Sequence, residues 1–281
     1  MRVMLAAALR LMLWATTLVK SAAGTQPGNS PRLPDIADQD FIERCVRAHN
    51  RFRGDVAPPA SDMLYMTWDE ALAKSARAWA RHCNFSHNHL LRTPGKVHPK
   101  FSPVGENIWV SSSSSFIVEK PIEMWKDEVS KYNYRTNKCS DVCGHYTQVV
   151  WAKSYKVGCA VHNCPQGILQ FSPEPTSIIF VCNYGDAGNF KGSRPYKEGK
   201  PCSSCQNTAC DNNMCRNDFT ACPPLVAGYS WSPSWDPGKD ENGSCTPLCI
   251  GLLITRPVLF LLTLLGVFGV QNIYPNIFAY E

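Results

Sequence analysis

The stretch 144–154 places a histidine, His145, ahead of small hydrogen-bonding residues and an apolar run. This pattern predicts one or two helical turns that lead into a strand, with His145 at the start of a buried element. Histidine serves as acid, base or metal ligand near neutral pH, although a lone buried histidine is more often a hydrogen-bonded core residue. Cysteines lie on both sides of the stretch, at Cys139, Cys143 and Cys159.

The second candidate for a functional group is the carboxylate of Glu128. It lies beside the apolar stripe of a helix that we expect to include Pro121 near its start; the stripe comprises Ile122, Trp125, Val129 and Tyr132. A carboxylate next to such a stripe must be paired, protonated or bound to something. His87 is a third candidate, because it follows a helix end that carries Cys83.

Four cysteines near residue 200 are spaced as Cys202-x2-Cys205-x4-Cys210-x4-Cys215. This spacing allows a zinc site with four thiolates, or two disulfides. The chain has 14 cysteines in all, which favours disulfides and an oxidising compartment. We expect a secretory signal peptide over residues 1–23, because an apolar stretch ends in the small residues Ser21-Ala22-Ala23.

The charge balance argues against nucleic acid as a partner. The formal charge is +5, and removal of the expected signal peptide, with its three basic residues, lowers it to +2. Two sequons, at Asn84 and Asn242, permit glycosylation in the secretory pathway.

The elements that must position these groups follow from the apolar pattern. A first helix is expected from Asp38 or Asp40 to Gly54. A capping box at Thr67–Glu70 predicts a second helix, capped by Thr67, and β-branched runs predict strands at 157–162 and 178–183.

The C-terminal part changes in composition. Residues 218–247 form an expected irregular linker, and residues 248–270 are apolar apart from Arg256 and Pro257. We expect a transmembrane segment there, in which Arg256 lies near an interface. A lipid-anchor signal cleaved near Gly243 or Ser244, and a secreted form with a buried tail, are the alternatives.

Four motifs in order resemble the CAP superfamily of cysteine-rich secretory, antigen 5 and pathogenesis-related group-one proteins, in its glioma pathogenesis-related branch. They are His49-Asn50-Arg51-Phe52-Arg53, Gly105-Glu106-Asn107-Ile108, the stretch 144–154, and the stretch 179–190, in which Asp186 replaces the usual proline. The resemblance implies an α+β fold, a three-layer α-β-α sandwich over residues 35–194. A cysteine-rich hinge at 195–217 would follow.

Site residues are also implied by the resemblance. Two histidines and two glutamates would line one cation-binding cleft, for which Zn²⁺ suits the nitrogen and oxygen donors: His87, Glu106, Glu128 and His145. Implied disulfides are Cys83–Cys164, Cys159–Cys182, Cys202–Cys210 and Cys205–Cys215. Cys139 and Cys143 are close enough in sequence to pair locally, which leaves Cys45 spare, together with one of Cys222, Cys245 and Cys249.

These features predict a non-catalytic binding protein that is extracellular or held at the plasma membrane. By resemblance, its ligand would be a sterol, another lipid or a protein partner, in an immune, reproductive or growth-related setting. The alternative is a zinc-dependent hydrolase or protease that uses the same four residues. Neither a Gly-x-Ser-x-Gly elbow nor a His-Glu-x-x-His pair occurs, which favours the non-catalytic interpretation.

Overall fold

The computed structural model describes residues 33–205, 208–216 and 231–238, with short helical stretches at 255, 259–263, 266–270 and 272–273. The expected signal peptide, the sequon at Asn242 and most of the expected linker and anchor lie outside these residues. Within the described part of the chain, no helix is both long and apolar enough to cross a membrane.

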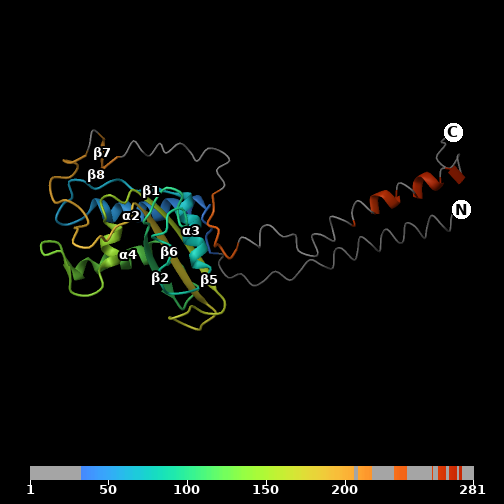
Figure 1. The fold of residues 1–281 in the computed structure, drawn as a ribbon, viewed down its shortest axis with the longest axis horizontal. Coiled ribbons are helices and arrows are strands. Elements are labelled where there is room, and N and C mark those ends of the chain that lie inside the picture. The colour runs from blue at the N-terminus through green and yellow to red at the C-terminus, as the bar shows by residue number, and fades with distance from the viewer. Residues whose placement is uncertain are drawn as a thin grey trace. The chain divides into compact units, whose positions relative to one another are not determined.

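A four-stranded sheet in the order β1-β5-β6-β2 runs through the middle of the described domain (Figure 1). The strands are β1 (Thr67–Trp68), β2 (Gly105–Ser111), β5 (Lys156–Cys164) and β6 (Ser177–Gly185). β1 pairs in parallel with β5, whereas β5–β6 and β6–β2 are antiparallel. The two strands predicted from β-branched runs are confirmed, and each is longer than predicted.

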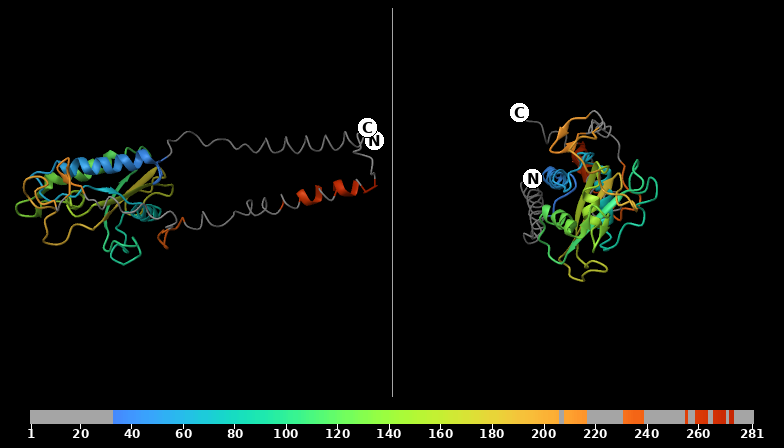
Figure 2. Two further views of the ribbon diagram at one scale, coloured as in Figure 1. Left: turned by 90° about the horizontal axis from the view of Figure 1, so that it is seen from above. Right: turned by 90° about the vertical axis from the view of Figure 1, so that its left-hand side faces the viewer.

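Helices cover both faces of the sheet (Figure 2). On one face lie α2 (Gln39–Gly54), α4 (Glu119–Asp127) and α5 (Gly144–Val149), and on the other lies α3 (Glu70–Ala80). The central strand β6 shows why: Phe180 and Tyr184 pack into the core with α2 and α4, while Ile179 and Val181 pack against α3. The predicted three-layer α-β-α sandwich is therefore confirmed.

Helix α2 begins and ends as the sequence predicts. The side chain of Asp38 accepts a hydrogen bond from the N–H of Asp40, and the helix ends at Gly54. Near its end, the fully buried Arg53 donates hydrogen bonds to the carbonyls of Leu64, Val149, Trp151 and Ala152. This guanidinium joins α2 to the segment that follows α5.

The predicted cap of the second helix is wrong. Thr67 lies in β1, where its N–H donates to the carbonyl of Tyr155, and the cap is Asp69, whose carboxylate accepts from the N–H of Leu72. Sheet pairing takes the backbone of Thr67, so the helix starts two residues later than a cap at Thr67 would place it. The helix buries Leu72, Ala76 and Trp79.

Five disulfides hold the described domain together, and all five predicted pairs are confirmed: Cys83–Cys164, Cys139–Cys143, Cys159–Cys182, Cys202–Cys210 and Cys205–Cys215. The last two close the hinge around the small sheet of β7 (Cys210–Asp211) and β8 (Met214–Cys215). Among the described cysteines, Cys45 is a buried free thiol. The hinge cysteines are therefore in disulfides and do not form the four-thiolate zinc site that their spacing allowed.

Residues 231–238, the docked segment, pack against α3 and the loop after it. The indole N–H of Trp235 donates to the carbonyl of Lys96 (2.8 Å), and its ring lies edge-on to Trp79. Arg81 donates to both carboxylate oxygens of Asp236, at 2.8 and 3.0 Å. Part of the expected linker thus belongs to the folded domain.

Candidate functional site

The first part of the site is a histidine–glutamate pair at the start of β2. Nδ1 of His87 lies 3.0 Å from Oε1 of Glu106, and the same oxygen accepts the backbone N–H of Asn88 at 2.9 Å. His87 is placed by the segment after α3, which the Cys83–Cys164 disulfide ties to the end of β5. His87, from the segment after α3, therefore contacts Glu106, from the edge strand β2.

This pair is unevenly exposed to solvent. The side chain of Glu106 is fully buried, while that of His87 is 64% exposed. Burial raises the pKa of Glu106 above its usual value, an effect that His87 opposes, and the hydrogen bond to Glu106 raises the pKa of His87. The second oxygen of Glu106, Oε2, is buried without a hydrogen-bond partner among the described residues.

The second pair lies at the start of α5. Nδ1 of His145 is 2.6 Å from Oε1 of Glu128, and Oε2 of Glu128 accepts the backbone N–H groups of His145 and Tyr146 at 3.0 and 3.2 Å. A carboxylate at a helix N-terminus satisfies N–H groups that lack partners within the helix. Glu128, the first residue of the 3₁₀ turn η1 (Glu128–Lys131), is thus paired, as its place beside the apolar stripe requires.

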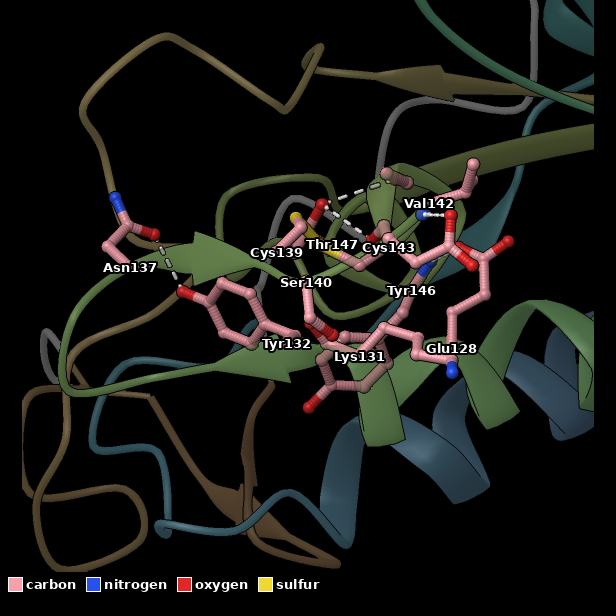
Figure 3. The surroundings of a disulfide bond; sticks show 12 residues. Glu128, Lys131, Tyr132, Asn137, Cys139, Ser140, Val142, Cys143, Tyr146 and Thr147 are labelled. Atoms are coloured by element: carbon pink, nitrogen blue, oxygen red, sulfur yellow. Dashed lines mark hydrogen bonds between the residues drawn. A yellow bond between two sulfur atoms is a disulfide. The ribbon is translucent and has the colours of Figure 1, made fainter.

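The surroundings of the second pair keep it in place. The Cys139–Cys143 disulfide links the hairpin of β3 (Tyr132–Asn133) and β4 (Lys138–Cys139) to the residue before α5, and Glu128 and Tyr146 lie beside it (Figure 3). The indole of Trp125 stacks on the imidazole of His145 with ring centroids 6.1 Å apart. His145 therefore sits at the start of a largely buried helical turn, as predicted.

The two pairs are joined through β2. The side-chain amide of Asn107, the neighbour of Glu106, donates to the carbonyl of His145 at 3.0 Å. Neighbouring residues of a strand point to opposite faces of the sheet. Glu106 is therefore part of the first pair, whereas Asn107 contacts His145 of the second pair. Within the described part of the chain, no group of three or more His, Cys, Asp or Glu side chains is arranged to hold a metal ion. The structure thus brings the four candidate residues together as two separate pairs.

The element around His49 is structural. Nδ1 of His49 donates to the carbonyl of Cys45 at 2.8 Å, so its Nε2 accepts from the hydroxyl of Tyr184 at 3.0 Å. Burial lowers the pKa of His49 to about 4, which keeps the ring neutral. His49 and Arg53 are therefore buried hydrogen-bonding groups of the fold.

Sequence reasoning missed Asn107 as the residue that connects the two pairs. Its signal was available, since Asn107 belongs to the Gly105-Glu106-Asn107-Ile108 motif. The sequon residue Asn84 lies in a described loop, and its side-chain oxygen is buried without a hydrogen-bond partner there.

Comparison with known proteins agrees with this architecture. The model of the "CAP: Cysteine-rich secretory protein family" matches residues 46–184. GLIPR1-like protein 1 of Bos taurus is 47% identical over 229 residues, which cover 80% of this chain and 90% of that protein. Glioma pathogenesis-related protein 1 of Mus musculus is 42% identical over 271 residues, 96% of this chain and 97% of that protein.

A solved structure has a similar fold. The crystal structure of Na-ASP-1 superposes with a TM-score of 0.51 at 27% identity and covers 69% of this chain and 51% of that chain.

Proposed function

Because this chain belongs to the cysteine-rich secretory protein (CAP) family, we propose that it is a non-catalytic binding protein of the extracellular space. Five disulfides in the described domain support an oxidising, extracellular environment. We propose further that His87, Glu106, Glu128 and His145 bind a divalent cation such as Zn²⁺.

The observation that carries the cation proposal is the way both histidines are oriented. Each places Nδ1 on a carboxylate, Glu106 or Glu128, at 3.0 and 2.6 Å. A histidine that binds metal usually gives its other ring N–H to a carboxylate, which fixes the ring orientation. His87 and His145 would therefore bind the cation through Nε2, with the glutamates behind them.

The pairs as described do not form a group of three donors. Sites held by two histidines keep open coordination positions, which water or a ligand can occupy.

The same contacts argue against the alternative of a metal-dependent hydrolase. A general base needs a free lone pair directed at the attacking water. Glu128 already accepts hydrogen bonds from His145 and two backbone N–H groups, and Glu106 is fully buried. The three hydrogen bonds that Glu128 accepts make it a poor candidate for the base, which supports a binding role.

We propose a sterol, another lipid or a protein partner as the organic ligand, and the exposed apolar residues offer one place for it. Phe85 and Phe171 contact each other edge-on with centroids 6.1 Å apart, beside the exposed Leu169. The native protein should bind a radiolabelled sterol saturably. Loss of that binding in a Phe85→Ser/Phe171→Ser variant would support a lipid ligand at these residues. Unchanged binding in that variant would place the lipid elsewhere.

Zinc titration calorimetry on the purified full chain tests the cation site. The native protein should bind Zn²⁺ with a simple stoichiometry, and His87→Ala/His145→Ala should lose that binding. The matched control is His82→Ala/His89→Ala, which also removes two imidazoles but leaves both pairs intact. Equal binding by all three proteins, or none by the native protein, would refute the cation site.

A further inference from the structure

Five exposed basic residues lie where the β3–β4 hairpin meets the segments after α5 and β6. They are Arg135, Lys138, Lys153, Arg194 and Lys197, and we call them the basic surface. Within the described part of the chain, none of them forms an ion pair with an acidic side chain. Their charges are therefore available to a partner.

Arg194 is held in place on this surface. Its Nε donates to the carbonyl of Tyr134 at 2.9 Å and its Nη2 donates to the carbonyl of Arg135 at 2.6 Å. The guanidinium lies 5.6 Å from the centre of the Tyr134 ring, which stacks on Tyr196 at 4.9 Å. A cation fixed in this way loses little conformational freedom when it binds an anion.

Three of the five basic residues line a hollow of about 500 Å³. Lys153, Arg194 and Lys197 line it together with two acidic residues, Asp62 and Glu198. The carboxylate of Asp62 accepts the backbone N–H of Lys197 at 2.9 Å, so it is already engaged. Three cations in the hollow and two more on the adjacent hairpin outnumber these two carboxylates and that of Asp186, which interacts electrostatically with Lys153.

We propose that the basic surface binds a sulfated polysaccharide. Such a chain carries anionic groups at regular intervals, which suits cations spread along a hollow and a hairpin, and binding releases the counterions of the polyanion. The proposal rests on the extracellular location given under the proposed function, because sulfated polysaccharides are polyanions of that space. It does not depend on the cation site.

The extracellular environment that the disulfides support favours this partner over a nucleic acid. The whole chain has a formal charge of only +5, so its attraction for polyanions is local to the basic surface. An acidic protein segment and an anionic membrane are the other partners that such charges attract, and the experiment distinguishes them.

The test measures binding of a size-defined heparin oligosaccharide to the purified full chain as a function of NaCl concentration. Lys153→Glu/Lys197→Glu should weaken binding roughly tenfold or more and flatten its salt dependence. The matched control, Lys96→Glu/Lys100→Glu, changes two exposed lysines on another loop by the same charge and should retain native binding. Lys153→Gln/Lys197→Gln should also weaken binding. This variant replaces Lys153→Glu/Lys197→Glu if the charge reversal perturbs folding.

Competition identifies the partner. The proposal requires that the desulfated oligosaccharide, polyglutamate and phosphatidylserine vesicles all compete poorly. Equal competition by polyglutamate would replace it with an acidic-peptide site, and equal competition by the vesicles would replace it with a membrane site. Equal losses in the lysine variant and its control, or no binding by the native chain, would also overturn it. Zinc titration of the same variants tests the cation site independently. A failure of the polysaccharide proposal can therefore be told apart from a failure of the cation site.

Discussion

At the scale of single residues, the two carboxylates of the site differ in the hydrogen bonds that they accept. Glu128 accepts three hydrogen bonds, whereas one oxygen of the fully buried Glu106 has no described partner. Burial raises the pKa of Glu106 and the hydrogen bond to His87 lowers it, and burial has the larger effect.

The pH dependence of the first pair has a definite sign. The pKa values of both His87 and Glu106 are raised in the folded protein. Both groups therefore bind protons more tightly when folded, and stability falls as pH rises through their folded pKa values. For His87, the stabilisation is fully present below about pH 6.5 and is lost as pH rises through its higher folded pKa.

A titration of His87 by NMR checks this electrostatic coupling. The imidazole of the native protein should have a pKa above its ordinary value, and Glu106→Gln should lower it because the carboxylate that favours the imidazolium is gone. Glu128→Gln is the control, since that residue contacts His145 instead. A His87 pKa that does not respond to Glu106→Gln would contradict the coupling.

At the scale of elements, the docked segment 231–238 shows how a stretch without helix or strand becomes part of a domain. Its indole, Trp235, contacts both Trp79 and His82 at the end of α3, with centroids 6.4 and 6.3 Å away. Burial lowers the pKa of His82, which keeps the stacked ring neutral. The ion pair of Arg81 with Asp236 adds a charge-assisted attachment.

Loss of that ion pair should loosen the docked segment. Asp236→Ala leaves Arg81 without its bidentate partner and removes the acceptor of the Gly238 N–H. We expect hydrogen exchange of residues 231–238 to accelerate roughly tenfold, which corresponds to about 1.4 kcal/mol of local stability. Asp127→Ala, which removes an exposed carboxylate in a long contact with Lys126, should leave that exchange unchanged. Equal exchange in both variants would show that the aromatic contacts alone hold the segment.

At the scale of the whole molecule, the disulfides join parts that are far apart in the chain. Cys83–Cys164 spans 81 residues and ties the segment after α3 to the end of β5, whereas Cys139–Cys143 spans only four. Cross-links over longer loops remove more entropy from the unfolded chain. The long bridge should therefore contribute more to the free energy of unfolding.

Urea unfolding of two double variants measures this difference. Cys83→Ser/Cys164→Ser should cost about 4–5 kcal/mol and Cys139→Ser/Cys143→Ser about 2 kcal/mol, by the chain-entropy relation. Similar losses from both would indicate that the loss of native contacts, and not loop entropy, sets their contributions.

The sequence by itself determined those parts of the protein that depend on near neighbours and on motif type. The start of α2 near Asp38 or Asp40, its end at Gly54 and the strands β5 and β6 follow from patterns within a few residues. The family resemblance predicted the three layers and four disulfide pairs, and short sequence separation predicted the fifth.

Only the tertiary structure decided the parts that depend on contacts between distant segments. Sheet pairing with the backbone around Tyr155 made Thr67 a strand residue, and so Asp69 became the cap. The four candidate residues of the site stand as two pairs because Glu106 and Asn107 point to opposite faces of an edge strand. The docked segment joins the domain through Trp235 and Asp236, whose partners lie about 140 and 155 residues away in the chain. Local spacing cannot specify such partners, because they meet only after the layers have packed.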